Sequence, residues 1–359
     1  MSASNMMAKI REPADRFMVM SLGLLSVRVI QGFIYWGGGS RRFIYGTQKI
    51  DPHSAHWMAN KFQTAMPGAL LGLEHVISFM LQHFWLLYAG IIIFSAAELF
   101  VGAFLMIGLF TRISAFISMI FSVLLMLMFG WQGATCIDEW TMAACNLAMG
   151  ATIFLCGSPH YAVDNIILKK HPSWEKSWLF RWCGGSLPAP LNDAGYKKLA
   201  LWTLLFVVVF DIGTYHHYRG SVVTWFHSGP VSPTKHHISL DSGVLNPDGS
   251  VSFHAYLDAG TPEAPVNIMD AWLINSQGEK VFHWDTRMLS SVPAANFRND
   301  YDYNKFKPAL YGIEGEVGAK ATITLPATAE PLKDEMPLTL RLVDSRGTEF
   351  SIMLREKTK

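Results

Sequence analysis

The sequence predicts an integral membrane protein: an all-α four-helix bundle plus a fifth transmembrane helix, followed by an all-β sandwich domain outside the cytoplasm. Half of the 359 residues are apolar and only 16% are charged, whereas a soluble domain carries about 25% charge. Residues 1–218 are poor in charge, with a net charge of +4, and residues 219–359 have a net charge of −3 at the charge density of a soluble domain. Long apolar stretches occur in the first part and short β-rich runs in the second.

The composition excludes three classes of protein. An apolar content of 50% is too high for an intrinsically disordered chain. Four cysteines in 359 residues are too few for a disulfide framework. A net charge of +1 does not fit a basic protein that binds nucleic acid.

Five stretches are long and apolar enough to form transmembrane helices. A hydrocarbon core about 30 Å thick needs roughly 20 mainly apolar residues, and the stretches are residues 17–36, 84–107, 113–131, 140–156 and 199–215. The first is not a cleavable signal peptide, because it is long, contains Arg28 and has no small-residue cleavage site after it. Residues 66–83 are amphipathic but too polar to span, so we expect an interfacial helix there.

The distribution of Lys and Arg over the short loops indicates the orientation. With the N-terminus inside, ten of these residues lie in inner segments and four in outer segments. We therefore expect a multi-pass protein of the cell inner (cytoplasmic) membrane with a cytoplasmic N-terminus. An odd number of spans places residues 219–359 in the periplasm or outside the cell.

The last part contains seven short β-rich runs separated by turn signals such as Asn246-Pro247-Asp248-Gly249. The runs are residues 237–245, 250–257, 267–275, 280–284, 320–325, 338–343 and 350–354. Their number and spacing predict a β-sandwich of immunoglobulin-like size, and residues 285–319 give no regular pattern. Three domains are therefore expected: residues 1–195, the four-helix domain with its inner loop; residues 196–218, the fifth transmembrane helix; and residues 219–359, the β-sandwich.

Arg28 and Glu98 are charges within the predicted spans, where a charge is rare and usually functional. At 1.5 Å per residue, both lie roughly 14 to 16 Å from the inner ends of their helices. A buried Arg28–Glu98 pair is therefore geometrically allowed. Such a pair either fixes helix packing or forms a polar pocket that meets a quinone head group or relays its protons, and both interpretations stay open.

Trp36-Gly-Gly-Gly-Ser-Arg41-Arg42 lies at the outer end of the first span, and Lys49 follows in the same loop. Positive charge on the outside runs against the insertion bias. Three glycines let backbone N–H groups approach a ligand, and guanidinium groups suit a tetrahedral oxyanion. Arg41, Arg42 and Lys49 are therefore candidates for an anion site, and an ordinary flexible loop is the alternative.

The sequence has no CxxCH haem site, no clustered cysteines for iron–sulfur, no GxGxxG after a strand and no P-loop, so we expect no haem, flavin, iron–sulfur centre or resident metal. Cys136 is a candidate thiol in or near an outer turn, and burial as a small apolar residue is the alternative. It lies about 13 Å along a helix from Cys145, too far for a disulfide unless the helix begins late. Several histidines match no defined metal site: His216, His217, His227, His236 and His237.

Several of these motifs resemble one family. Glu98-Leu-Phe-Val-Gly102 running to Gly108-Leu-Phe-Thr111-Arg112, together with Arg28 and with Gly157 and Asp164 after the fourth span, resembles the DoxX/DoxD membrane superfamily. GGGSRR followed by Lys49-Ile-Asp51-Pro52 resembles DoxD, and the fifth span with the β-rich part resembles DoxA. The whole chain therefore resembles a fused DoxD/DoxA thiosulfate:quinone oxidoreductase.

The resemblance implies that two thiosulfates are oxidised to tetrathionate, with a diffusible or bound membrane quinone as electron acceptor. The implied partners are thiosulfate, quinone and the bilayer, with a homo-oligomer or a respiratory oxidase as further possibilities and no nucleic acid. From the residues themselves, the catalytic candidates are Arg28, Glu98 and Cys136, and the substrate-binding candidates are Arg41, Arg42 and Lys49. The alternative function is a non-catalytic accessory or assembly subunit of a terminal quinol oxidase.

Overall fold

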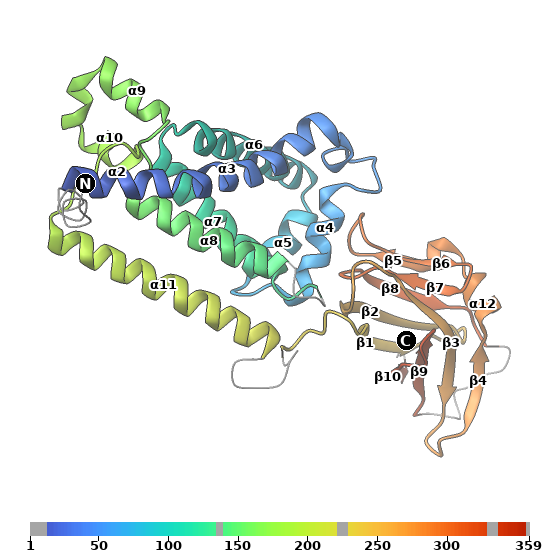
Figure 1. Ribbon diagram of the computed structural model, residues 1–359. Coiled ribbons are helices and arrows are strands. Elements are labelled where there is room, and N and C mark those ends of the chain that lie inside the picture. Colours follow the sequence, from blue (N-terminus) through green and yellow to red (C-terminus); the bar gives the residue numbers. More distant parts are fainter. Residues whose placement is uncertain (1–12, 134–138, 221–228, 329–336, 357–359) are drawn as a thin grey trace. The chain divides into compact units, whose positions relative to one another are not determined.

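The computed structural model describes residues 13–133, 139–220, 229–328 and 337–356 (Figure 1). The chain divides into two compact units, and each is considered by itself. The first unit consists of Met1–Trp57, Tyr88–Leu127 and Cys136–Thr224, and the second of Met58–Leu87, Met128–Thr135 and Trp225–Lys359.

The first unit is helical. Its long helices are α2 (Pro13–Gly23), α3 (Leu25–Ser40), α6 (Phe84–Ile107), α7 (Thr111–Phe129), α8 (Glu139–Cys156) and α11 (Asp193–Arg219). A π-helical turn, η1 (Arg41–Tyr45), and a 3-10 turn, η2 (Thr47–Lys49), follow α3, and three short elements separate α8 from α11: α9 (Val163–Lys170), η4 (Pro172–Lys176) and α10 (Trp178–Cys183).

Among the described residues, four helices are long and apolar enough to cross a membrane: Met18–Tyr45, Phe84–Ile107, Thr111–Phe129 and Asp193–Arg219. The prediction of a membrane protein is confirmed. The expected span at residues 140–156 is a helix, α8, but it is not one of these four. It has 18 residues and includes Glu139 and Asn146, which lower its hydropathy, so a count of five spans stays a prediction.

The residues that follow Trp36 are helical, and the expectation of a glycine loop there is wrong. α3 continues through Ser40, and its glycines bring it close to α6. A Cβ atom at Gly39 would lie 2.6 Å from the Leu99 backbone nitrogen, and one at Gly102 would lie 2.1 Å from the Trp36 backbone nitrogen. Small residues commonly allow membrane helices to approach in this way.

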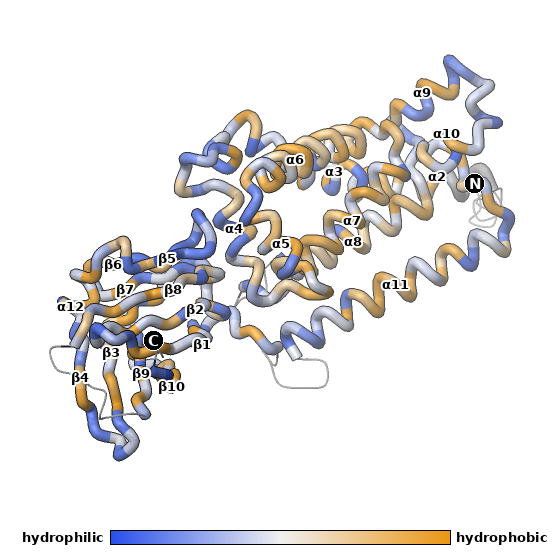
Figure 2. The backbone as a smooth tube through the Cα atoms, turned by 180° about the vertical axis from the view of Figure 1, so that it is seen from behind, coloured by the Kyte–Doolittle hydropathy of each residue, from blue (hydrophilic) through white to orange (hydrophobic). Residues whose placement is uncertain are grey.

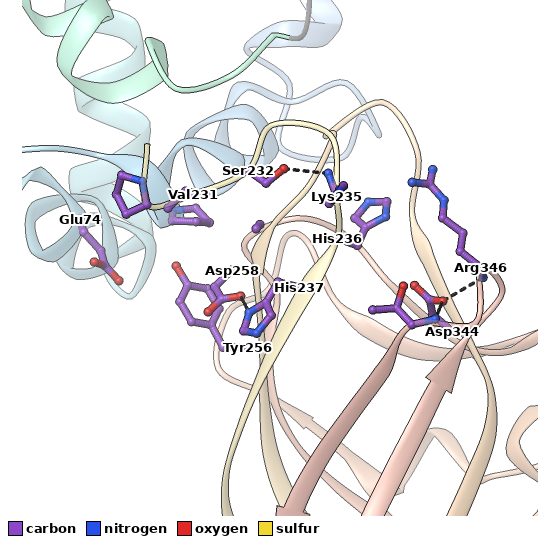
Figure 3. A pocket seen from close by; sticks show the side chains of 14 residues that line it. Glu74, Val231, Ser232, Lys235, His236, His237, Tyr256, Asp258, Asp344 and Arg346 are labelled. Carbon is purple, nitrogen blue, oxygen red and sulfur yellow. Dashed lines mark hydrogen bonds and ion pairs between the residues drawn. The ribbon is translucent and has the colours of Figure 1, made fainter. Parts of the chain in front are cut away.

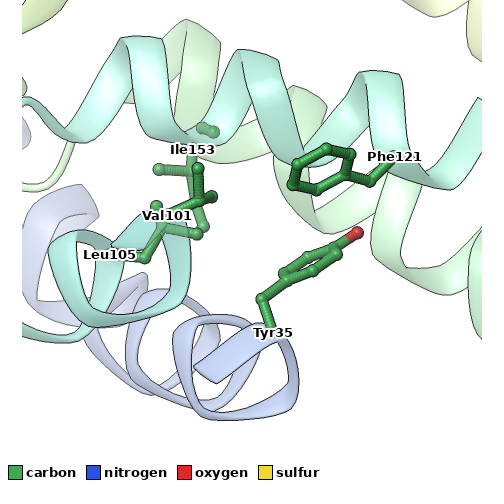
Figure 4. Packing of buried hydrophobic residues seen from close by; sticks show 6 residues of the cluster. Tyr35, Val101, Leu105, Phe121 and Ile153 are labelled. Carbon is green, nitrogen blue, oxygen red and sulfur yellow. The ribbon is translucent and has the colours of Figure 1, made fainter. Parts of the chain in front are cut away.

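Apolar side chains from four helices form the core of the bundle. One cluster joins α3, α6, α7 and α8 through Tyr35, Val101, Leu105, Ala115, Phe121 and Ile153 (Figure 4). A second cluster includes Met126 and Leu147, and Val207 and Phe210 of α11 pack against it. Other apolar side chains of α11, such as Trp202, are exposed. Figure 2 shows how strongly apolar α6 and α7 are along their lengths.

The second unit contains two β-sheets, with strand orders β11-β1-β2-β8-β5 and β10-β9-β3-β7-β6, and β4 pairs with β3. The strands are β1 (His237–Leu245), β2 (Val251–Ala259), β3 (Val266–Ile274), β4 (Lys280–Trp284), β5 (Phe297–Asn299), β6 (Phe306–Ala309), β7 (Gly312–Gly315), β8 (Lys320–Leu325), β9 (Thr339–Asp344), β10 (Glu349–Met353) and β11 (Arg355–Glu356). Buried and partly exposed side chains alternate along β2, β8 and β9, as expected of strands with one buried face.

Each of the seven β-rich runs corresponds to a strand, but the expectation of irregular structure at residues 285–319 is wrong in part. That region contains α12 (Thr286–Ser290), η5 (Ala294–Asn296) and the strands β5, β6 and β7. These strands have only three or four residues and include Pro308, Gly312 and Gly315. Such short runs give no readable alternation of apolar and polar side chains.

Residues 58–87 also belong to the second unit. They form α4 (Met58–Ala65), η3 (Met66–Gly68) and α5 (Leu73–Leu81), so the helix expected at residues 66–83 is confirmed only in its second half. Gly72, at φ +79°, interrupts it. The Gln63 amide donates to the carbonyls of Asn304 and Gly318, both at 2.9 Å, and α4 is thereby joined to the β-rich part of the unit.

Candidate functional site

Arg42 and Glu98 form an ion pair in the first unit. The guanidinium Nη1 of Arg42 donates to Oε2 of Glu98 and lies 3.4 Å from Oγ of Ser95. The side chains are 16% and 13% exposed, and the guanidinium carbon of Arg42 lies 5.9 Å from the centre of the Phe94 ring. The pair is therefore largely withdrawn from solvent, and each charge has its counter-ion.

The local sequence explains why this pair can form. Gly38 and Arg42 are four residues apart, so they lie on the same face of a helical segment. A Cβ atom at Gly38 would lie 3.2 Å from Oε2 of Glu98, which is tighter than an ordinary contact. The missing side chain at Gly38 thus leaves room for the carboxylate, and Arg42 covers it one turn later.

Arg28 does not pair with Glu98, and the predicted Arg28–Glu98 pair is wrong. Nη1 of Arg28 donates to the Ser158 carbonyl at 2.5 Å and the His160 carbonyl at 3.1 Å, and Nη2 donates to the Tyr161 carbonyl at 2.9 Å. The buried guanidinium therefore holds the segment that follows α8. Three backbone carbonyls share its donors.

The register between α3 and α6 explains the error. Gly32 packs against Met106 and Gly39 against Leu99, so the two antiparallel helices place Arg28 level with the end of α6. A Cβ atom at Gly108 would lie 3.0 Å from Nη1 of Arg28. The prediction assumed that the inner ends of the two spans lie level, whereas Gly32 lies beside Met106, near the end of α6.

A row of polar side chains lies between α3, α7 and α8. The Tyr35 hydroxyl donates to the Ser118 carbonyl and lies 2.9 Å from Oγ of Ser122. The Gln31 amide donates to Oγ of Ser118 at 3.1 Å and to the Asn146 carbonyl at 2.9 Å. Within the described part of the chain, Oε1 of Gln31 and Oδ1 of Asn146 are buried without a hydrogen-bond partner.

Sequence reasoning missed this polar row. Its signal was present, because Gln31 and Tyr35, like Ser118 and Ser122, are four residues apart and share a helix face. The row provides acceptors and donors next to the apolar core. An unpaired amide oxygen in such a place is an available hydrogen-bond acceptor.

The remaining residues of the superfamily signature hold the loops at the other end of the bundle. The Asp164 carboxylate accepts from the backbone N–H groups of Phe110, Thr111 and Gly185 at 2.7 to 3.1 Å. Arg112 donates to three backbone carbonyls, those of Phe154, Arg181 and Gly184. Asp164 thus accepts hydrogen bonds from the N–H groups at the start of α7. Arg112 donates to carbonyls at the ends of α8 and α10.

The other predicted site residues are not part of the Arg42–Glu98 ion pair. Arg41, the C-cap residue of α3, and Lys49, the last residue of η2, are exposed. Cys136 lies outside the described residues. Cys145, Cys156 and Cys183 are not in disulfides, and no group of three potential metal ligands occurs among the residues that the structure describes.

Two family models match the sequence. "TQO small subunit DoxD" matches residues 24–190 and "TQO small subunit DoxA" matches residues 219–352. α11 falls almost entirely between the two matches. A solved structure, residues 217–571 of TarS from S. aureus, is 11% identical over 69% of this chain and 66% of that chain, with a TM-score of 0.19, a similarity too weak to bear on the fold.

Proposed function

Since the chain belongs to the DoxD and DoxA families, joined in one polypeptide, we propose that it is a membrane-bound thiosulfate:quinone oxidoreductase. Two thiosulfate dianions lose one electron each and form the central S–S bond of tetrathionate. The two electrons and two protons convert a membrane quinone to its quinol. Both family matches carry the name TQO, which supports an oxidoreductase linked to quinone.

The observation that carries the proposal is the Arg42–Glu98 pair within helices long enough to span a membrane. A quinone head group offers two carbonyl oxygens as acceptors, and its reduction requires protons. Arg42 supplies a fixed donor for a carbonyl oxygen, and Glu98 is a carboxyl group that can hold a proton in a region of low dielectric. The buried Tyr35 and Gln31 extend this polar surface along α3.

Arg28 acts in this proposal by positioning rather than by touching a substrate, because both terminal nitrogens of its guanidinium are bonded to backbone carbonyls. Arg41 and Lys49 attract thiosulfate from the outer side, since both are exposed. Cys136 keeps its proposed thiol role. We further propose five spans with the N-terminus inside and the two sheets packed as a sandwich outside.

The test is thiosulfate-dependent reduction of a soluble quinone analogue by the purified full chain in detergent. We expect the parent chain to reduce the quinone, Glu98→Gln to lower kcat by about 10²-fold or more, and the matched surface variant Glu175→Gln to keep the parental rate. A purified, folded parent chain that reduces no quinone would replace the oxidoreductase with the accessory-subunit function.

A further inference from the structure

The second unit contains a cavity of about 890 Å³ beside the first strand of the β-rich part (Figure 3). Its walls come from residues 230–237, from β2, from the turn between β9 and β10 and from the helical segment that includes Glu74. Pockets of roughly 300–1,000 Å³ are typical of sites for small molecules. The cavity is therefore large enough for more than one small anion.

The acidic groups of the cavity already have partners within the unit. Asp344 is buried and accepts the backbone N–H groups of Arg346 and Thr348 at 2.8 and 2.7 Å. Asp258 accepts from Nδ1 of His237 at 2.6 Å and from the Ser239 hydroxyl. Both carboxylates are therefore hydrogen-bonded within the unit.

The carboxylate of Glu74 also has a partner, in this case a charged one. Its carboxylate lies 3.8 Å from Nζ of Lys320, and that ammonium group also lies 4.1 Å from the centre of the Tyr256 ring. The charge of Glu74 is therefore offset in part by Lys320.

The donors of the cavity remain available to a ligand. Lys235 and Arg346 both line it, and Nη1 of Arg346 makes one long contact, 3.4 Å, with the Thr234 carbonyl. In the described part of the chain, the Tyr256 hydroxyl is buried and has no hydrogen-bond partner. In Figure 3 this hydroxyl points away from the strand, toward the space between Glu74 and Val231.

Burial also affects the protonation of two side chains that line the cavity. Burial raises the pKa of Tyr256, and the charges of Glu74 and Asp258 raise it further, so its hydroxyl stays protonated and serves as a donor. Burial lowers the pKa of His236 below its usual range, so this ring is neutral at neutral pH and adds no positive charge to the cavity.

We propose that this cavity binds a divalent sulfur oxyanion, through the charges of Lys235 and Arg346 and the hydroxyl of Tyr256. Under the proposed function, on which the identity of the anion rests, the occupant is thiosulfate or the tetrathionate made from it. The size of the cavity suits this class of anion. The reaction joins two thiosulfates into the longer tetrathionate, and a cavity of about 890 Å³ can hold either. The β-rich unit then collects or releases the sulfur compound.

The experiment measures thiosulfate binding to the full chain in detergent by titration calorimetry, without quinone. The double variant Lys235→Gln/Arg346→Gln should weaken binding at least about tenfold, because two charge-assisted contacts are lost, and Tyr256→Phe should weaken it several-fold. Lys280→Gln is the matched control, since this lysine lies on Trp272 outside the cavity. It should leave binding unchanged.

Unchanged thiosulfate binding in the folded double variant would overturn the inference, as would equal competition by nitrate, a monoanion. Loss of binding in Arg41→Gln with retention in the double variant would also overturn it. Failure of the proposed function has a different signature. The parent chain would then bind thiosulfate in the cavity, with the expected losses in the variants, but would reduce no quinone.

Discussion

Arg42 pairs with Glu98 across the contact between η1 and α6, and the side chain that is missing at Gly38 makes room for the carboxylate. The pair thus depends on three positions, two of which lie in a run that looks like a loop in the sequence. Burial makes each charge dependent on the other, because an uncompensated charge in a low-dielectric interior is costly.

The first prediction concerns this mutual dependence. Arg42→Met should destabilise the chain by about 3–5 kcal/mol or force Glu98 to take up a proton, since it leaves a buried carboxylate without its counter-ion. Glu98→Leu should destabilise similarly, and the double variant should recover much of the loss. Thermal unfolding in detergent measures all three, with Arg41→Met as the exposed control. Losses that simply add in the double variant would show that the two groups are not coupled.

The second prediction separates Arg28 from that pair. Arg28→Met should leave three backbone carbonyls without their donor, at roughly 1–3 kcal/mol for each that stays buried. Glu98→Leu should not rescue it, because Arg28 contacts the segment after α8 instead. The measurement is again thermal unfolding, together with proteolysis of residues 157–162. Rescue of Arg28→Met by Glu98→Leu would mean that the two side chains do meet.

Sequence reasoning could predict the membrane helices and the seven longer strands because each is a run of apolar or β-rich residues long enough to be recognised. It placed Arg28 and Glu98 correctly as charges within helices, but not their partners. Depth along a helix is a local property, whereas the pairing depends on the register between α3 and α6. Glycines set that register through backbone contacts, which no hydropathy pattern reveals.

The cavity of the second unit could not have been predicted for a similar reason. Lys235, Tyr256 and Arg346 are separated by 21 and 90 positions in the chain, and each alone is an ordinary residue of a β-rich domain. All three line one cavity only in the folded unit, since Tyr256 belongs to β2 of one sheet and Arg346 to the turn between β9 and β10 of the other. The hydrogen bonds of Asp258 and Asp344 likewise require contacts that the sequence does not specify.

The third prediction concerns stability at low pH. Burial opposes ionisation of Asp241, but hydrogen bonds from Ser242 and His254 outweigh it and hold the pKa of Asp241 below the ordinary 3.8. The unfolded chain therefore binds the proton more readily, so the contribution of Asp241 to stability is present above pH 3.8 and is lost as the pH falls through the lower, folded pKa.

Asp241→Asn should accordingly be less stable than the parent chain above that range, with the difference closing as the pH falls. Thermal unfolding over a pH series measures this difference. Asp302→Asn is the matched control, because that side chain is 97% exposed. A difference that stays constant down to low pH would contradict the assignment of the shifted pKa to Asp241.

The fourth prediction concerns topology. If the Lys and Arg distribution sets the orientation, the segment of residues 169–181 lies inside and the β-rich part outside. Single cysteines at Lys176 and at Lys280 report this in a background without the native cysteines. An impermeant thiol reagent should label the second in intact cells and the first only after permeabilisation. The reverse pattern would place the β-rich part in the cytoplasm.

The fifth prediction concerns the exposed cations that follow α3. Arg41 is the C-cap residue of that helix, where the helix dipole repels anions, so only side-chain charge can attract thiosulfate there. Arg41→Gln and Lys49→Gln should each raise the thiosulfate KM by about two- to fivefold, the effect of one exposed charge, and leave the quinone KM unchanged. Steady-state kinetics of quinone reduction measure both constants.

The salt dependence adds a second readout that packing changes would not produce. Rising ionic strength screens exposed charges, so it should raise the parental thiosulfate KM and do so less in the two variants. Lys307→Gln is the control, because this lysine is paired with Glu314 at 2.9 Å in the second unit. If Arg41→Gln and Lys49→Gln keep the parental KM and salt response while Lys235→Gln/Arg346→Gln does not, thiosulfate is attracted by the cavity of the second unit and not by the end of α3.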